Sequence, residues 1–161
     1  MTALHLLRHA HAGDPAKWDA PDAARPLSAR GRRQAELLGG LLAATGEAPD
    51  VFVTSPKVRA AETAELVAAA IGAPVVVDER AAAILGLDEL ERILAESAGG
   101  AERPCVVGHD PDFSGLLGDL LGIAPVPMRK GAIARVDVSR PLAYGRGVLR
   151  WLLPPEIVPD R

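Results

Sequence analysis

The sequence has little cysteine and few aromatic residues, and both shortages limit the functions that it can have. Its one cysteine, Cys105, excludes an internal disulfide framework and any metal site built on cysteine ligands. Two tryptophans, two phenylalanines and one tyrosine are too few for a platform on which the bases of a single-stranded nucleic acid stack. We interpret Cys105 as a small buried apolar residue.

Charge of one sign and long apolar runs are also missing. The formal net charge is −3 at pH 7 and no block of like charges occurs, so neither a nucleic acid nor an anionic membrane is expected as a partner. The apolar stretches are shorter than the roughly 18 residues of a membrane span. Because Met1-Thr2-Ala3 lacks the basic start of a signal peptide, we expect a cytoplasmic protein.

The length and composition indicate one domain with a substantial core. A chain of 161 residues, of which 48% are hydrophobic, can bury such a core but is too short for two domains of ordinary size. We therefore predict a single domain over residues 1–161, with a peripheral tail over residues 154–161.

Short apolar runs alternate with longer segments of helical periodicity along the chain. The runs that predict strands cover residues 2–7, 50–54, 74–77, 104–108, 132–138 and 148–153. The periodic segments predict helices that begin at the caps Ser28, Ser55-Pro56 and Asp110-Pro111, and a further helix over residues 87–97. Residues 12–27 are expected to form a loop, and residues 80–86 fit either a loop or a helix.

This alternation indicates an α/β fold with a mainly parallel sheet covered on both faces. We expect the last two strands to pair at the sheet edge across a turn at residues 145–147. The carboxyl ends of parallel strands meet at one edge of the sheet, where such folds bind their ligands. Three strand-to-helix junctions carry polar side chains and should therefore converge on one crevice: Arg8-His9, Ser55 with Arg59, and Gly108-His109.

Two arginines at these junctions suggest an anion. Arg59 falls in the first turn of its predicted helix, where the positive end of the helix dipole disfavours a cation by roughly 0.3–1 kcal/mol. A bound phosphate would offset this cost, because free N–H groups and a guanidinium both match its oxygens. The alternative is a solvated surface arginine. Arg8 follows a buried strand and either extends to solvent or points at a ligand, and its pairing with Arg59 favours the ligand.

The histidines fit phosphate chemistry in different ways. Beside two arginines the charged form of His9 is disfavoured, which leaves a neutral imidazole whose lone pair can attack phosphorus. His109 lacks metal-ligand partners, and as a donor it would stabilise the equatorial oxygens of an in-line phosphoryl transfer. His11 lies nearer the mouth of the crevice and fits a contact with phosphate, substrate or solvent. We interpret His5 as a structural residue of its strand.

Other catalytic sites do not fit the spacing. A cysteine phosphatase needs an arginine six residues after its cysteine, and Pro111 occupies that position. A P-loop needs a glycine-lysine-hydroxyl triplet after a strand, which the sequence lacks. A metal held by the N-terminal histidines is disfavoured by the alternation of a strand and by the absence of a carboxylate partner. We expect no metal and no cofactor.

With these residues in place, the chain resembles the histidine phosphatase superfamily, the group shared with phosphoglycerate mutases, and more narrowly the SixA-type phosphohistidine phosphatases. The matching segments are LLRHAHA at 6–12, RPLSARGRRQA at 25–35, VTSPKVRAAETA at 53–64 and VVGHDPDFSGLLGDLL at 106–121. They span most of the chain in the family's order. Many relatives have glycine where this chain has Ala10, a variant that leaves His9 unchanged. The resemblance implies a three-layer α/β/α sandwich of the phosphoglycerate mutase type.

The resemblance also implies roles for individual residues. In a metal-independent phosphatase of this kind, His9 is transiently phosphorylated while Arg8, Arg59 and His109 hold the phosphoryl group. Arg25 matches a position close to the pocket and is a weaker candidate for contact with phosphate.

A proton donor for the leaving group is harder to assign. Larger relatives supply a carboxylate, and the nearest equivalent here is Glu79. A phosphoramidate needs less help, because a leaving imidazole nitrogen accepts a proton more readily than an alkoxide forms at neutral pH. Only 16 residues separate His11 from Ser28, so we expect an open pocket that suits a phosphohistidine presented by another protein.

Three functions remain open from the sequence. The first is a phosphohistidine phosphatase acting through phospho-His9 on a protein such as a histidine phosphotransfer domain, with phosphate as product. The second is a small-molecule phosphomonoesterase of the same superfamily, which needs a working acid. The third is a non-catalytic module that binds phosphorylated proteins, which the intact His9 and His109 disfavour. We expect a monomer.

Overall fold

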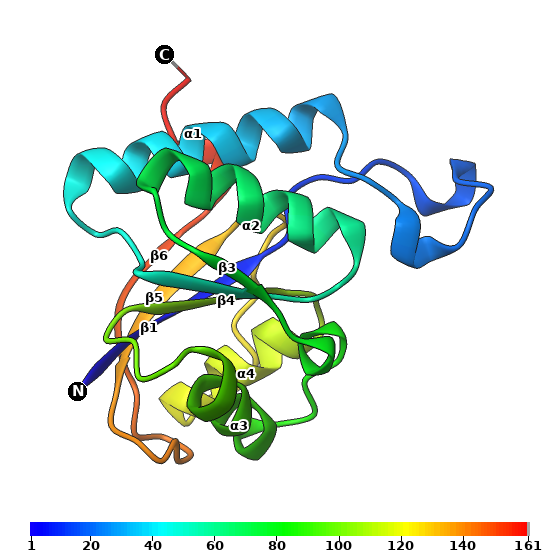
Figure 1. Ribbon diagram of the computed structural model, residues 1–161. Helices are drawn as coiled ribbons and strands as arrows, with labels where there is room; N and C mark the ends of the chain where they lie inside the picture. Colours follow the sequence, from blue (N-terminus) through cyan, green and yellow to red (C-terminus); the bar gives the residue numbers. More distant parts are fainter. Residues whose placement is uncertain (161) are drawn as a thin grey trace.

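A six-stranded sheet forms the middle layer of the computed structural model, which describes residues 1–160 (Figure 1). The strands are β1 (Thr2–Arg8), β2 (Val51–Thr54), β3 (Val75–Val77), β4 (Pro104–Gly108), β5 (Ile133–Val138) and β6 (Val148–Leu153). Their order across the sheet is β3-β2-β4-β1-β5-β6. The first four strands run parallel, whereas β5 is antiparallel to both β1 and β6. The predicted parallel sheet with an antiparallel edge is confirmed.

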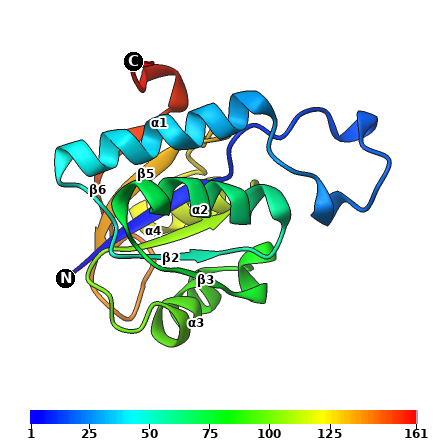
Figure 2. The ribbon, with the colours of Figure 1, turned by 45° about the horizontal axis from the view of Figure 1, so that its top comes forward.

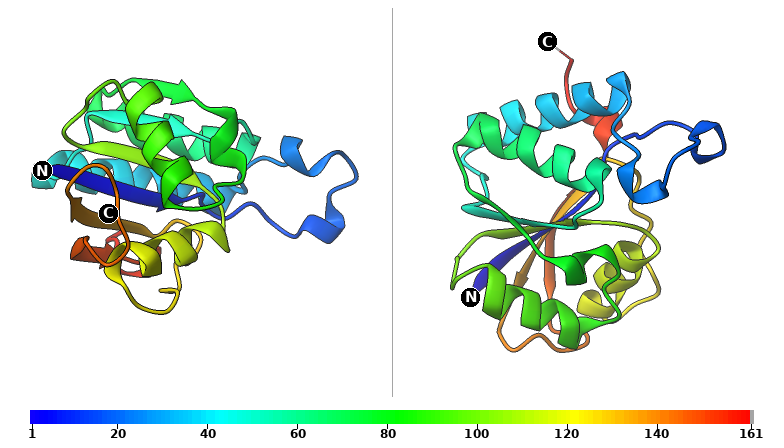
Figure 3. Two further views of the ribbon diagram at one scale, coloured as in Figure 1. Left: turned by 90° about the horizontal axis from the view of Figure 1, so that it is seen from below. Right: turned by 45° about the vertical axis from the view of Figure 1, so that its right-hand side comes forward.

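Helices cover both faces of this sheet, as Figures 1 and 3 show. The helices α1 (Ala29–Thr45) and α2 (Val58–Ile71) lie on one face, and α3 (Leu87–Ser97) and α4 (Asp112–Leu121) lie on the other. The connections contain four short turns of 3-10 helix, which are η1 (Pro15–Lys17), η2 (Asp22–Ala24), η3 (Glu79–Ala82) and η4 (Pro155–Ile157). The three-layer α/β/α sandwich implied by the resemblance is therefore confirmed.

The core has two halves because successive side chains of a strand point to opposite faces. In β1, Leu4 and Leu6 pack in the cluster that includes residues of α3 and α4, whereas Leu7 packs with residues of α1 and α2. All three leucines are fully buried. With both faces of the central strands covered, polar side chains that must reach a ligand are confined to the ends of the strands.

Two helices begin later than the sequence predicts. The hydroxyl of Ser55 accepts a hydrogen bond from the backbone N–H of Lys57 at 3.1 Å, which closes a turn, and α2 begins at Val58. Asp110 likewise accepts from the backbone N–H of Ser114 at 2.9 Å, and α4 begins at Asp112. Both predicted caps bind backbone N–H groups, but Ser55 stands three residues before the first residue of α2 and Asp110 stands two residues before that of α4, so neither is next to its helix.

Other connections also differ in detail from the sequence-based expectation. Of residues 80–86, the first three complete η3 and the rest precede α3 without regular structure. The connection between β5 and β6 covers residues 139–147 and is longer than the predicted turn, because Gly145 and Gly147 donate their N–H groups to carbonyls of α4. Within residues 1–160, no helix has the length and apolar character needed to cross a membrane.

The C-terminal segment lies over α1 (Figure 2). Asp160 forms an ion pair with Arg33 of α1, and Glu156 of η4 forms one with Arg129 at 2.8 Å. The segment thereby borders the same end of the molecule as the carboxyl end of β1.

Candidate active site

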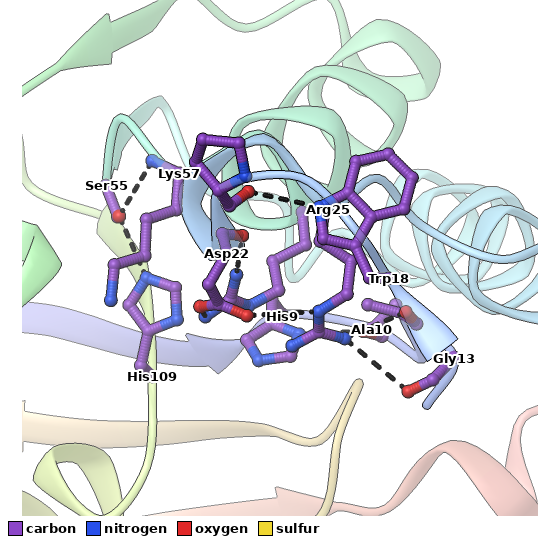
Figure 4. Close-up of polar contacts among 12 residues, drawn as sticks. His9, Ala10, Gly13, Trp18, Asp22, Arg25, Ser55, Lys57 and His109 are labelled. Carbon is purple, nitrogen blue, oxygen red and sulfur yellow. Dashed lines mark hydrogen bonds and ion pairs between the residues drawn. The ribbon is translucent and has the colours of Figure 1, made fainter. Parts of the chain in front are cut away.

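The sheet register brings the predicted site residues together at one edge. Arg8 at the end of β1 is paired with Gly108 at the end of β4, so the next residues, His9 and His109, leave the sheet side by side. The N–H of His9 donates to the carbonyl of Gly108 at 3.0 Å, and the two imidazole centroids are 5.2 Å apart. The end of β2, next to β4, adds Ser55 (Figure 4).

The ring of His9 is fixed in one tautomer by the backbone. Its Nδ1 lies 2.8 Å from the carbonyl oxygen of Ala10. A carbonyl only accepts hydrogen bonds, so Nδ1 carries the proton and Nε2 keeps a free lone pair. His9 is buried, with 5% of its surface exposed, and its backbone neighbour Ala10 is held in turn by the Thr63 hydroxyl at 3.1 Å. His9 therefore presents an oriented imidazole whose Nε2 is unprotonated when the ring is neutral.

The ring of His109 is oriented by Ser55. Nε2 of His109 lies 2.8 Å from the Ser55 hydroxyl, which already accepts a hydrogen bond from the N–H of Lys57. The hydroxyl can donate its own proton to Nε2, and in that arrangement the ring proton of His109 lies on Nδ1. Figure 4 shows that nitrogen on the side of the ring that faces Asp22 and His9.

Two buried arginines reach the site from the opposite side and share a carboxylate. The Arg59 guanidinium donates to the carboxylate of Asp22 and to its backbone carbonyl, each at 3.0 Å. Arg25 donates to the other carboxylate oxygen at 3.2 Å and to the carbonyl of Ala12 at 2.8 Å. Asp22 lies in η2, so the loop between β1 and α1 supplies an internal anion that partly balances the arginines.

Arg8 approaches from the end of β1. Its guanidinium donates to the carbonyl of Met128 at 2.8 Å and lies 3.6 Å from the Asp110 carboxylate. These two contacts hold one end of the guanidinium, and its Nε atom is buried without a hydrogen-bond partner among residues 1–160.

Three nitrogen atoms of the site are buried without partners in the described part of the chain. They are Nε of Arg8, Nε of Arg59 and Nδ1 of His109. Folded proteins pair the great majority of their buried polar groups, so an orphaned set calls for an explanation. The three come from separate elements that meet at one strand end, and their donor chemistry matches the oxygens of a tetrahedral anion. Their arrangement supports a site for a phosphoryl group.

The electrostatics keep both histidines neutral at pH 7. Burial lowers the pKa of His9 to about 4, with the charges of Arg59 and Arg8 acting in the same direction. Burial also lowers the pKa of His109 to about 3, assisted by neighbouring charges. Burial opposes the ionisation of Asp22, but hydrogen bonds and charges from both arginines hold its pKa below the ordinary value. The site thus combines ionised arginines with neutral imidazoles.

The structure also places the weaker candidates from the sequence. Arg25 is buried beside Asp22, as described above. Nδ1 of His11 lies 2.6 Å from the hydroxyl of Ser28, at the start of α1, and His11 is only half-buried. His11 lines a second cavity that it shares with Arg8.

Two candidates lie away from this cluster. Glu79 is exposed at the start of η3 and makes no hydrogen bond or ion pair with any residue from 1 to 160. His5 is buried in the core, with its ring centroid 5.8 Å from that of Trp151. The role of Glu79 as a proton donor stays a prediction.

One residue of the site was not predicted to contact it, and for a second residue the contact that it makes there was not predicted. Asp22 lies in a segment without periodicity, and its only signal is its spacing of three residues before Arg25. Ser55 carries a visible signal, but the sequence pattern indicates a helix cap and does not reveal the distant His109. Within residues 1–160, no group of three or more histidine, cysteine or acidic side chains is arranged to hold a metal ion.

Comparison with known structures places this fold among phosphatases. The protein histidine phosphatase SixA in complex with tungstate matches with a TM-score of 0.80 and 25% identity, over 96% of this chain and 97% of that one. SixA of Agrobacterium tumefaciens, assigned as a phosphohistidine phosphatase, matches with a TM-score of 0.76 and 24% identity over 96% and 98% of the two chains. A mycobacterial glucosyl-3-phosphoglycerate phosphatase matches with a TM-score of 0.71 and 18% identity, over 94% of this chain and 98% of that one.

Comparison of the sequence identifies the family. No sequence among the curated proteins matches the chain. Residues 4–84, about half of the chain, match the model of branch 1 of the histidine phosphatase superfamily. This span includes Arg8, His9, Arg25 and Arg59, and the whole chain shares the phosphoglycerate mutase-like fold of the solved structures. The protein therefore belongs to the histidine phosphatase superfamily.

Proposed function

We propose that the protein is a metal-independent phosphohistidine phosphatase, which hydrolyses phosphohistidine on another protein through a covalent phospho-His9 intermediate. The observation that carries this proposal is the neutral His9, whose unprotonated Nε2 stands beside three buried, unpartnered donors. A nucleophile with a pKa of about 4 stays unprotonated throughout the physiological range. The donors match the charge that develops on the phosphoryl oxygens in the transition state.

In the first step, the lone pair of His9 Nε2 forms a bond to phosphorus as the N–P bond of the substrate breaks. The electron pair of that bond leaves with the substrate nitrogen, and a proton on the other nitrogen of the substrate ring lets it leave as neutral imidazole. Arg8, Arg59 and His109 hold the equatorial oxygens in line with attack. The proton of His9 stays on Nδ1, where it is hydrogen-bonded to the carbonyl of Ala10, so the phosphorylated ring is cationic and a good leaving group.

In the second step, water attacks the phosphorus of phospho-His9. The N–P bond breaks, its electron pair returns to Nε2, and the oxygen and hydrogens of water leave with inorganic phosphate. Because His9 returns to its starting tautomer without an external proton, neither step requires a carboxylic acid in the site.

The absence of such a requirement favours an N–P bond over a phosphate ester. Asp22, whose carboxylate binds Arg25 and Arg59, has a lowered pKa and is ionised at pH 7, so it is a poor proton donor to an alkoxide. A solved structure 25% identical to this chain is a protein histidine phosphatase bound to tungstate, and tungstate is a tetrahedral oxyanion like phosphate. Both observations support a phosphorylated protein, such as a histidine phosphotransfer domain, as the substrate.

Trapping of the intermediate tests this function. A protein labelled with ³²P on histidine should transfer label to the wild type, and the label should be labile to acid and stable to alkali. The His9→Ala variant should take up no label, whereas His109→Ala keeps the nucleophile and should be labelled more slowly. Label of the same chemistry and amount on His9→Ala would show that another residue is the nucleophile.

A small-molecule phosphomonoesterase is the second candidate, because similar structures include a glucosyl-3-phosphoglycerate phosphatase. An ester needs an acid for its alkoxide, and Glu79 is the carboxylate that the resemblance offers. Loss of a general acid lowers turnover by roughly 10²–10⁴-fold. Since Glu79 is exposed and makes no contact with the site, we expect Glu79→Gln to change ester turnover less than about threefold, a margin far below that loss. A decrease in the ester turnover of Glu79→Gln by roughly 10²–10⁴-fold would favour the ester function.

A further inference from the structure

A cavity next to the proposed phosphoryl site is lined mainly by cations. Its volume is about 290 Å³, and Arg8 contributes to its wall. Three further cations line it, together with one carboxylate, one amide and one imidazole: Arg30, Arg129, Lys130, Glu156, Gln34 and His11. Because Arg8 belongs to both spaces, a group in this cavity lies next to a phosphoryl group bound by His9.

The side chains of two of these cations form no ion pair in the described part of the chain. Arg129 is paired with Glu156 at 2.8 Å, and Arg8 lies 3.6 Å from Asp110. The side chains of Arg30 and Lys130 make no hydrogen bond or ion pair with any residue from 1 to 160. Arg30 acts electrostatically on Glu156, which is already paired with Arg129. The cations of the cavity therefore outnumber its one carboxylate, which favours an anion as the occupant.

The backbone holds Lys130 in this position. The next residue, Gly131, donates its N–H to the carbonyls of Arg8 and His9 at 3.1 and 2.9 Å. Gly131 has a φ of +85°, a conformation that side chains disfavour, so the turn depends on glycine here. Burial lowers the pKa of Lys130, and the charges of Arg8 and Arg25 lower it further. The side chain of Lys130 therefore lies among other cations rather than extending into solvent.

The start of α1 forms the facing wall. Arg30 lies in the first turn of α1, which has no acidic residue, so its cation adds to the positive end of the helix dipole. The side-chain oxygen of Gln34 accepts the N–H of His11 at 3.1 Å, which leaves the amide hydrogens of Gln34 without an intramolecular acceptor within residues 1–160. Helix, amide and cations all offer positive charge to the same space.

We propose that this cavity binds a carboxylate of the protein that carries the phosphohistidine, an acidic side chain placed beside the phosphorylated residue. The proposal rests on the phosphohistidine phosphatase function above and adds to it a substrate class, an acidic surface around the phosphohistidine. Glu156 already shows how a carboxylate fits one wall, through its ion pair with Arg129. The cavity opens next to Arg8, so one protein surface can fill both spaces.

Two matched peptides test the proposal on the full-length protein. Both carry one phosphohistidine made with phosphoramidate; one has glutamates beside it and the other has glutamines. We expect kcat/KM of the wild type to be about tenfold higher for the glutamate peptide, a ratio in keeping with two surface charge contacts. In the variant Arg30→Gln/Lys130→Gln this ratio should fall to about one. Because the readout is a ratio, any change in the chemical step cancels.

The matched control is Arg146→Gln. Arg146 is exposed in the connection between β5 and β6, at the end of the sheet opposite the site, and its variant should keep the wild-type ratio. Equal kcat/KM for the two peptides with the wild type would overturn the second anion site while leaving the phosphatase function standing. Failure to hydrolyse either peptide would overturn the phosphatase function and this proposal with it. Faster cleavage of a small bisphosphate than of the glutamate peptide would assign the cavity to a second phosphate instead.

Discussion

Burial keeps His9 and His109 neutral, and a different contact orients each of the two neighbouring rings. Nδ1–H of His9 donates a hydrogen bond to the carbonyl of Ala10, and His109 contacts the hydroxyl of Ser55 through Nε2. The carbonyl fixes the tautomer of His9 that presents a lone pair, and donation by the Ser55 hydroxyl gives His109 the tautomer that presents a proton. The proposed roles of nucleophile and donor thus depend on the two groups next to the rings, a carbonyl and a hydroxyl.

The burial of His9 predicts how its ring titrates. Its ring should stay neutral from pH 8 down to about 5, because burial lowers its pKa to about 4 from the ordinary 6.5. Long-range ¹H–¹⁵N spectra should show the tautomer with the proton on Nδ1. A midpoint near 6.5, or a proton on Nε2, would contradict the account of the nucleophile.

The contact between Ser55 and His109 gives a second prediction. Ser55→Ala should lower the rate of phospho-His9 formation by about tenfold, in line with the loss of about 1–1.5 kcal/mol from one hydrogen bond. KM should change little, because the serine does not contact substrate. The control is Ser139→Ala, an exposed serine at the opposite end of the sheet, which should keep the wild-type rate. Equal rates of phospho-His9 formation in the two variants would show that Ser55 does not orient His109.

The sequence predicts which residues meet at this site better than it predicts what sets their protonation states. The neutral state of His9 was expected from neighbouring arginines, and the structure gives burial as the larger cause. Burial depends on the packing of distant elements, which a local pattern does not show. Asp22 was missed for the same reason, since its contacts with Arg25 and Arg59 exist only once the loop has folded over α2.

At the scale of elements, α1 is anchored to the site strand through Gly31. A Cβ added at Gly31 would lie 1.9 Å from the carbonyl oxygen of His11, which also accepts hydrogen bonds from the backbone and hydroxyl of Ser28. This close approach lets the first turn of α1 sit directly on the chain that leaves β1. The phosphoryl site and the cationic cavity thus share one fixed wall.

Replacing either of two glycines of α1 by alanine should therefore change the stability in opposite directions. Gly31→Ala should lower the free energy of unfolding by about 2 kcal/mol, because the new methyl group displaces the helix from His11. Gly40→Ala meets open space in the same helix and should raise it by about 0.5–1 kcal/mol through helix propensity. Urea denaturation measures both. A neutral or stabilising effect of Gly31→Ala would show that α1 is not held this closely.

The elements themselves follow from the sequence to different degrees. Apolar runs predicted the strands well, since burial leaves a local signal. The helices α1 and α2 end at Gly46 and Gly72, whose left-handed backbone favours glycine and leaves a signal of the same local kind. The start of α2 was predicted two residues early and that of α4 one residue early. Ser55 and Asp110 have the composition of caps, but their side chains also serve His109 and Ser114, contacts that only the folded chain makes.

The molecule as a whole buries three of its four histidines without charging them. Burial lowers the pKa of His5 and His9 to about 4 and that of His109 to about 3. In the unfolded chain these groups titrate near 6.5. Below pH 6.5 the unfolded state therefore binds more protons than the folded state, and the stability that is fully present above this pH decreases.

The free energy of unfolding should fall as the pH is lowered from 6.5 to 4. The expected slope is about 1.4 kcal/mol per pH unit for each buried histidine in the middle of this range. His5→Leu, which removes one of the three without touching the site, should reduce the slope by about one third. Urea titrations between pH 4.5 and 7.5 measure it, and a stability independent of pH in this window would contradict the burial of neutral histidines.

The central claim is that the site is built for an N–P bond, and a comparison of substrates tests it most directly. The measurement is kcat/KM for a protein phosphorylated on histidine against that for a panel of alkyl phosphate monoesters, with His9→Ala as the control for both. We predict that kcat/KM is roughly 10²–10⁴-fold higher for the phosphohistidine protein. This factor is the usual contribution of a general acid, which an alkoxide leaving group needs and the site does not supply. Hydrolysis of an alkyl ester at an equal or higher kcat/KM through His9 would contradict the claim.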